Sequence, residues 1–127
     1  MGAQLMDVPF YTVCKADPTV QALLGGTSPR IYPFGEAPQT VAKPYVVYQW
    51  IGGDPFNMLN CRPDADRASL QVDVYGLTTQ STTTVAKAIR YAVELQSYIT
   101  GYRGDMRDEE TLLYRTSFDL DWLVERT

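Results

Sequence analysis

Strict alternation of apolar and polar residues in two segments most limits the structures that this chain can form. Within residues 69–76, Leu70, Val72 and Val74 alternate with residues that are polar or amphipathic. Residues 112–124 alternate in the same way. Successive side chains of a β-strand point to opposite faces, so each segment predicts a strand with one buried face and one wet face. The chain must therefore cover one face of a sheet with another layer.

Three further segments are expected to join this sheet. Residues 45–51 are rich in β-branched and aromatic residues and predict a strand that ends at a pair of glycines. Residues 30–34 predict a short strand at a sheet edge, because Pro33 has no N–H to donate. Residues 102–108 are expected to form a strand that turns at residues 109–111 into the last one.

One long helical pattern is available to cover the sheet. Val85, Ile89 and Val93 recur at helical spacing within residues 79–98, and Gly101 is expected to end the helix. The polar segment between the glycine pair and residue 69 predicts a long loop over residues 54–67, and loops of that length are often functional.

Two short helices are expected ahead of the sheet. The first begins near Pro9. The second is opened by Asp17 as N-cap with Pro18 at the first helical position, runs through Leu24 and is ended by Gly25 and Gly26. The fold class is therefore predicted as α+β: an antiparallel or mixed β-sheet packed on one face by a long helix, with short N-terminal helices. A chain of 127 residues can build one core, so residues 1–127 are expected to form a single domain.

The absence of histidine from the chain excludes much of catalytic and zinc chemistry. Without it, neither Cys14 nor Cys61 has the usual activating base, and both are expected to be reduced thiols in a cytoplasmic protein. Carboxylate or lysine chemistry remains open. Asp64 and Asp66 resemble the start of a calcium loop, but neither the required glycine nor the bidentate glutamate follows them. No metal and no cofactor is therefore expected.

Asp119 and Asp121 are the candidate acid–base pair. They lie on one expected strand face, which places their carboxylates roughly 7 Å apart and could suit glycoside hydrolysis. Arg115 and Ser117 share that face, and no apolar neighbour favours a neutral carboxyl group. A solvated or interface-facing strand is the favoured interpretation, so the chain is not expected to be an enzyme.

The charge of the chain bears on its partners. The net charge is −4, which argues against duplex DNA binding because that affinity comes from clustered Lys and Arg. The aromatic residues Tyr45, Tyr48 and Trp50 could stack on single-stranded bases, but only Lys43 is near, so core packing and a subunit interface are favoured. No apolar stretch approaches eighteen residues and no leader is visible, so neither membrane insertion nor secretion is expected.

Four ordered stretches carry a family resemblance. They are residues 16–25 (ADPTVQALLG), 30–38 (RIYPFGEAP), 44–48 (PYVVY) and 70–76 (LQVDVYG), the last followed by the long helix. Together they resemble the tail-completion and tail-terminator family of long-tailed bacteriophages. The resemblance implies a structural virion protein whose subunits form a hexameric ring that caps the tail tube and joins the tail to the head or neck.

The resemblance also implies partners and a location. The expected partners are further copies in a homo-hexamer, the major tail tube protein and a neck or head-completion protein, with DNA passing through the ring without specific binding. The expected location is the tail–neck junction of the virion, after assembly in the host cytoplasm. The alternatives are another small neck or connector ring subunit, a small acid-catalysed hydrolase that uses Asp119 and Asp121, and a monomeric regulatory binding module.

A ring of identical head-to-tail contacts requires two different patches on each subunit. The candidates are the sheet edge near residues 30–34 and the outer face of the long helix. Acidic residues of the expected loop are predicted to face the channel or to dock on the tail tube. The predicted subunit or tail interface residues are Arg30, Tyr32, Asp54, Asp64, Asp66, Lys87, Arg90 and Glu94.

Overall fold

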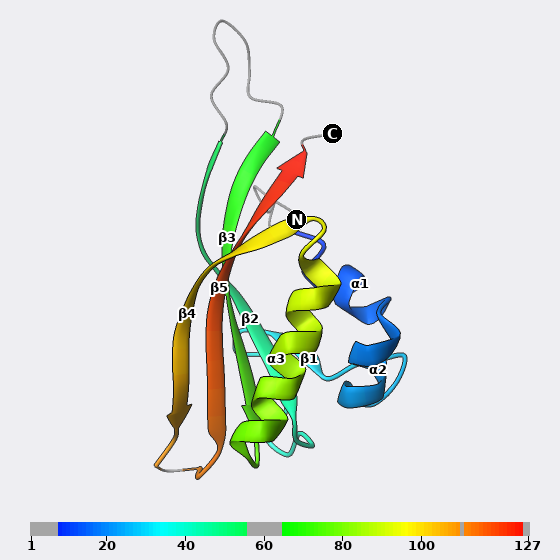
Figure 1. The fold of residues 1–127 in the computed structure, drawn as a ribbon, viewed down its shortest axis with the longest axis vertical. Helices are drawn as coiled ribbons and strands as arrows, with labels where there is room; N and C mark the ends of the chain where they lie inside the picture. The colour runs from blue at the N-terminus through cyan, green and yellow to red at the C-terminus, as the bar shows by residue number, and fades with distance from the viewer. Residues whose placement is uncertain (1–7, 56–64, 110, 126–127) are drawn as a thin grey trace, which may run out of the picture.

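The computed structural model describes residues 8–55, 65–109 and 111–125 of the chain. Five strands form one sheet in the order β1-β2-β3-β5-β4 (Figure 1). β1 is parallel to β2, and the other neighbouring pairs are antiparallel, so the sheet is mixed. The strands are β1 (Ile31–Pro33), β2 (Tyr45–Pro55), β3 (Ala65–Gly76), β4 (Ser97–Arg107) and β5 (Tyr114–Glu125).

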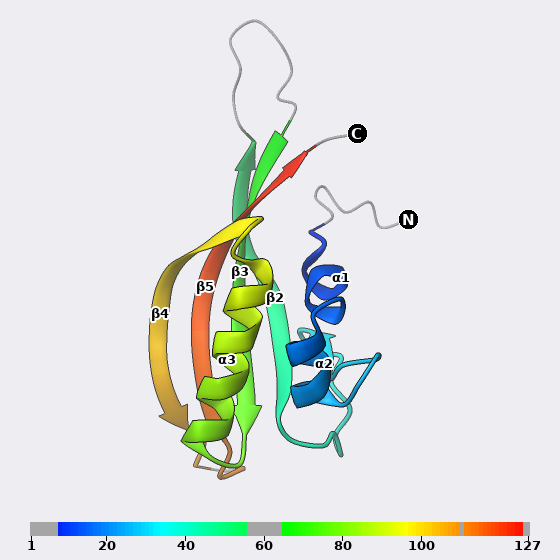
Figure 2. The ribbon, with the colours of Figure 1, turned by 45° about the vertical axis from the view of Figure 1, so that its right-hand side comes forward.

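Three helices lie on one side of this sheet. α3 (Thr79–Val93) packs along the face formed by β3 and β5, and α1 (Phe10–Lys15) and α2 (Pro18–Leu24) pack beside it (Figure 2). The predicted α+β class, with a long helix on one face and short N-terminal helices, is confirmed. Among the described residues, no helix combines the length and the apolar character needed to cross a membrane.

The core is formed by the apolar residues at helical spacing in α3 and the apolar residues that alternate along the strands. Val85, Ile89 and Val93 of α3 are fully or almost fully buried, as their helical spacing predicts. Each such side chain stabilises the fold by about 1.5–3 kcal/mol relative to full exposure. The facing residues of the strands and short helices are Val46, Leu70, Val72, Val74, Phe118, Leu120 and Trp122, with Phe10, Cys14, Val20 and Leu24.

The ends of α2 follow from its sequence. The Asp17 carboxylate accepts hydrogen bonds from the N–H groups of Thr19 at 2.9 Å and Val20 at 3.1 Å, which satisfies two donors that the first turn leaves free. Gly25 takes a left-handed conformation with φ of 101° and ends the helix. Both predicted boundaries are confirmed.

The long helix ends at Val93, so the expectation that it continues to residue 98 is wrong. The Ser97 hydroxyl donates to the Val93 carbonyl at 2.9 Å, and the chain then turns back as β4. Ile99 pairs with β5, and β-branched and aromatic residues favour such a strand over a further helical turn. Gly101, expected to end the helix, instead lies in β4 at a register shift.

The expected loop over residues 54–67 is also wrong in its bounds. β2 does not stop at the glycine pair: its register shifts between Trp50 and Gly52, and the strand continues to Pro55. β3 begins at Ala65, before the expected start at residue 69. Beyond the bulge, β2 and β3 continue to pair, and their backbone N–H and C=O groups form hydrogen bonds with each other. This pairing makes both strands longer than expected.

Candidate functional site

The sheet face that points away from α3 is polar and internally hydrogen-bonded. The Ser117 hydroxyl donates to Asp73 at 2.6 Å, and the Ser69 hydroxyl donates to Asp121 at 2.6 Å. Gln71 also donates to Asp73, at 3.2 Å. Asp73, Ser117 and Asp121 are buried, so the expectation that this whole face is wet is wrong. Neighbouring strands cover these short side chains, and each of these three residues has a hydrogen-bond partner, as burial requires.

The candidate acid–base pair is divided between separate partners. Two nitrogens of Arg103 donate to the two carboxylate oxygens of Asp119, at 2.9 and 3.0 Å. Asp121 accepts from Ser69 and lies 3.9 Å from the nearest guanidinium nitrogen of Arg67. Both carboxylates therefore already have donors, which favours a polar strand face over a hydrolytic centre.

Cys14 is fully buried between the short helices and the rest of the core. Burial, and to a lesser extent the negative charge of Asp17, raise the pKa of the Cys14 thiol to about 12. The thiol is therefore protonated at neutral pH and is a poor nucleophile. Cys61 lies outside the described residues. Within the described part of the chain, no group of three or more Cys, Asp or Glu side chains could hold a metal ion.

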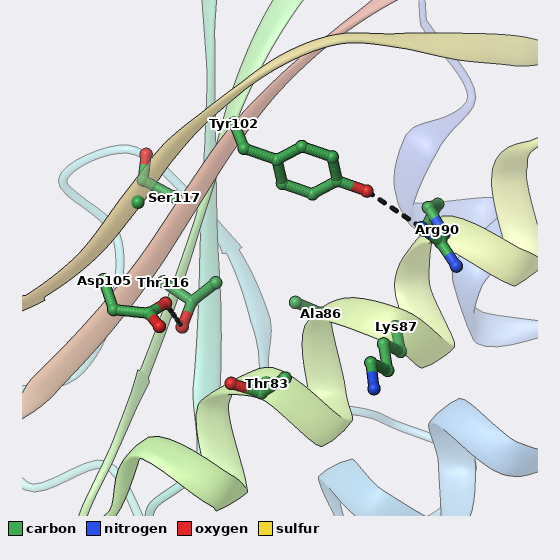
Figure 3. A pocket seen from close by; sticks show the side chains of 9 residues that line it. Thr83, Ala86, Lys87, Arg90, Tyr102, Asp105, Thr116 and Ser117 are labelled. Carbon is green, nitrogen blue, oxygen red and sulfur yellow. Dashed lines mark hydrogen bonds between the residues drawn. The ribbon is translucent and has the colours of Figure 1, made fainter.

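A groove of about 380 Å³ lies between α3 and β4, and its walls are mainly apolar. Arg90 of α3 donates to the Tyr102 hydroxyl of β4 at 3.0 Å across one part of it (Figure 3). The Thr116 hydroxyl lies 2.7 Å from Asp105 and 2.7 Å from the Thr82 hydroxyl. The lining residues are Thr83, Ala86, Lys87, Arg90, Tyr102, Gly104, Asp105, Thr116 and Ser117.

The sequence features that form the groove are local. Ala86 presents a small side chain toward the sheet, so the helix leaves space at this level. β4 is an edge strand whose register against β5 shifts at Gly101 and again before Gly104, where φ is 91°. Such bulges bend an edge strand and re-aim its side chains. The groove is therefore an open hollow on the β4 edge of the sheet, with cations on its helical wall.

Three of the predicted interface residues lie on α3 or at its C-terminal end. Lys87, Arg90 and Glu94 are exposed, as expected for the outer face of the long helix. Lys87 and Arg90 both line the groove. Glu94 is the C-cap residue of α3, and its N–H donates to the Arg90 carbonyl at 3.0 Å.

The other predicted residues lie elsewhere. Tyr32 is in β1, at the confirmed edge position opposite β4, and the Arg30 side chain donates to the Pro44 carbonyl at 2.9 Å. Asp54 pairs with β3, and Asp66 lies in β3 between β2 and β5, so neither is in a loop. Asp64 lies outside the described residues. The eight residues therefore do not form one site.

The sequence predicted a strand over residues 102–108 that turns into the last strand, and β4 pairs with β5 in this way. It did not identify Tyr102 and Asp105 as site residues, because no local pattern shows that they face α3 across a groove. The predicted aromatic cluster is also split between faces. Tyr48 packs on Phe10 with ring centroids 4.9 Å apart, whereas Tyr45 stacks on Tyr75 at 5.1 Å on the polar face. The separation arises because successive side chains of a strand point to opposite faces, which puts Tyr45 and Tyr48 on different sides of the sheet.

Comparison with known proteins identifies related sequences and folds. Residues 8–125 match the family model described as tail completion protein gp17. A chain in a solved structure entitled "Virion of native gene transfer agent (GTA) particle" has a similar fold, with a TM-score of 0.66 and 15% sequence identity over 91% of each chain. No curated protein sequence gives a significant match.

Proposed function

Because the chain belongs to the family of tail completion protein gp17, we propose that it is a structural protein of a phage-like virion and completes the tail. The single observation that carries this proposal is the extent of the family match, which covers residues 8–125 and hence every described helix and strand. The polar sheet face supports a structural role. Its acidic side chains accept hydrogen bonds from neighbouring residues of the same chain, so they are not arranged as a catalytic centre.

The finer assembly is part of the same proposal. Six copies form a ring that caps the tail tube and joins it to the head or neck, and the genome passes through without specific binding. The two exposed edges of the sheet, β1 and β4, support a head-to-tail ring because they offer different surfaces on opposite sides of one subunit. The net charge of −4 supports a lumen that repels DNA.

The predicted interface residues take separate roles in this assembly. Lys87, Arg90 and Glu94 belong to the subunit contact, since they are exposed beside the groove. Asp54 and Asp66 belong to the tail-tube or channel side, since both lie at the far end of the β2–β3 ladder.

The test is removal of the gene from a genome that otherwise assembles particles. We expect unjoined heads and tails, or tails of abnormal length, in electron micrographs, and normal particles when the chain is supplied in trans. Binding of the purified chain to isolated tail tubes rather than to isolated heads distinguishes a tail terminator from a neck subunit. Normal joined particles in the complete absence of the chain would contradict the proposed function.

A further inference from the structure

Phe34 is a large apolar side chain that a tight turn holds in solvent. The Glu36 N–H donates to the Pro33 carbonyl at 3.0 Å, and Gly35 at the third position has φ of 84°, as a type II turn requires. The Phe34 N–H also donates to the Tyr48 carbonyl at 2.9 Å, which ties the turn to β2. Phe34 is nevertheless 68% exposed. A side chain presented in this way loses little backbone freedom when a partner covers it.

Apolar side chains also gather around the groove on the opposite edge of the sheet. Tyr102 lines the groove and is exposed on β4, and Tyr91 and Leu95 are exposed on α3 and just beyond it. Clustered exposed apolar residues beside a hollow mark protein–protein contacts. The groove volume of about 380 Å³ and its mainly apolar walls leave room for an aromatic side chain.

Charge on the two surfaces is complementary. Glu36 is exposed two residues after Phe34, on the same turn. Lys87 and Arg90 are exposed on the helical wall of the groove. The negative charge of Glu36 beside Phe34 therefore complements the positive charges of Lys87 and Arg90 beside the groove. Such complementarity fixes the orientation of a contact more than its strength.

The two surfaces lie at different edges of one sheet, so a subunit cannot bring them together by itself. Phe34 directly follows β1, whereas the groove is bounded by β4 at the other edge. β1 has three residues and ends in Pro33, which makes it a poor partner for strand addition. A contact through projecting side chains is the alternative. A contact between two unlike patches is head-to-tail, and it forms a ring when the rotation between neighbouring copies closes.

We propose that Phe34 of one copy inserts into the groove between α3 and β4 of a second copy, with Glu36 facing Lys87 and Arg90. The occupant of the groove is thus another molecule of this chain. The inference deepens the proposed ring and rests on it, since it assigns the two patches that a head-to-tail contact needs.

The first measurement is sedimentation equilibrium of the purified full chain with Phe34→Asp. We expect self-association to weaken by at least about tenfold, because a buried aromatic anchor commonly carries much of the energy of a contact. Leu77→Asp is the matched control, since Leu77 is 67% exposed, does not line the groove and is not part of the turn over residues 33–36; it should associate like the wild type. The melting temperature of each variant establishes that the fold is intact.

A charge reversal tests the orientation. Glu36→Lys alone, and Lys87→Glu with Arg90→Glu, should each weaken association, and the three changes together should restore it. Unchanged association of Phe34→Asp, failure of the triple variant to recover any association, or a wild-type chain that stays monomeric at every concentration would each overturn the inference.

Particle assembly separates this inference from the proposed function. If Phe34→Asp abolishes self-association and particles still join normally, the docking contact stands and the ring role is contradicted. If Phe34→Asp associates normally but cannot complete tails, the partner of Phe34 is a tail or neck protein, and the inference of a second copy fails.

Discussion

Individual residues of this chain are constrained most strongly where a titratable or polar group is buried. The Cys14 thiol has no contact with water, and its ionised form is disfavoured by burial and by Asp17. On the polar face of the sheet, Asp73 is also buried but keeps the hydroxyl of Ser117 as a donor. These two sites respond differently to mutation, because the thiol needs no hydrogen-bond partner whereas the buried carboxylate must keep its donor.

Cys14 predicts a loss of stability in alkali. An unfolded thiol releases its proton near pH 9, whereas the folded pKa is about 12, so between these values the native state binds more protons. The free energy of unfolding should therefore fall with rising pH in this window, by up to about 1.4 kcal/mol per pH unit, and be unaffected by this group below it. Urea unfolding of wild type and Cys14→Ala from pH 8 to 11 checks this. Equal slopes in both proteins would show that Cys14 does not contribute.

We expect the small substitution Ser117→Ala to lower the stability of the fold substantially. Ser117→Ala removes the 2.6 Å donor of the buried Asp73 carboxylate and leaves the longer hydrogen bonds from Gln71. We expect a loss of about 1–3 kcal/mol in the free energy of unfolding at neutral pH. Thr84→Ala, at an exposed position of α3, is the control and should change stability far less. A similar effect of both substitutions would contradict the role assigned to the Asp73–Ser117 pair.

At the scale of elements, the boundaries of helices and strands decide where the surfaces lie. α2 ends at Gly25 because a left-handed residue stops the helix and directs the chain toward β1. α3 ends at Val93 because the following residues pair with β5, and this pairing creates β4 and with it the groove. The end of α2 is determined by local sequence. The end of α3 is determined by strand pairing with β5, which outweighs the local preference for further helix.

The conformation of Gly25 at the end of α2 predicts that adding one methyl group there, as in Gly25→Ala, lowers stability. Gly25→Ala would have to keep φ of 101°, and its Cβ would collide with the Arg30 guanidinium. We expect a loss of roughly 1–2 kcal/mol from the left-handed conformation alone. Gly52→Ala is the matched control, since a Cβ there meets open space. Chemical denaturation of both variants measures the difference, and a Gly25→Ala chain as stable as Gly52→Ala would contradict this account of the helix end.

At the scale of the molecule, the sheet separates three surfaces. The β1 edge presents Phe34, the β4 edge presents the groove, and the far end of the β2–β3 ladder carries Asp54 and Asp66. A ring subunit with two lateral contacts and one axial contact needs this kind of separation, because each partner must approach from a different direction.

The axial role predicts a separable defect. Shortening residues 56–64 to a tight turn should leave the melting temperature of the domain nearly unchanged, because the described core lies on the other part of the sheet. Tail joining should be lost, as scored by electron microscopy of particles assembled with the shortened chain. A length-matched replacement of the same residues by glycine and serine is the companion variant. Unchanged assembly with the shortened chain would contradict an axial contact here.

Local patterns predicted much of this architecture. Alternation identified β3 and β5, Pro33 placed β1 at an edge, and Asp17 and Gly25 marked the ends of α2. These features depend on backbone preferences and on side-chain periodicity, which act over a few residues. The same reasoning placed Lys87 and Arg90 on an exposed helical face.

The sequence by itself determined the fold class, the buried faces of β3 and β5 and the absence of histidine chemistry. The tertiary structure alone decided that α3 stops at Val93, that β4 forms the second sheet edge, and that Asp73 meets Ser117. Those outcomes depend on which strand pairs with which and in what register. Such pairings join residues tens of positions apart, and their energies compete with local preference, so no short window of sequence contains them.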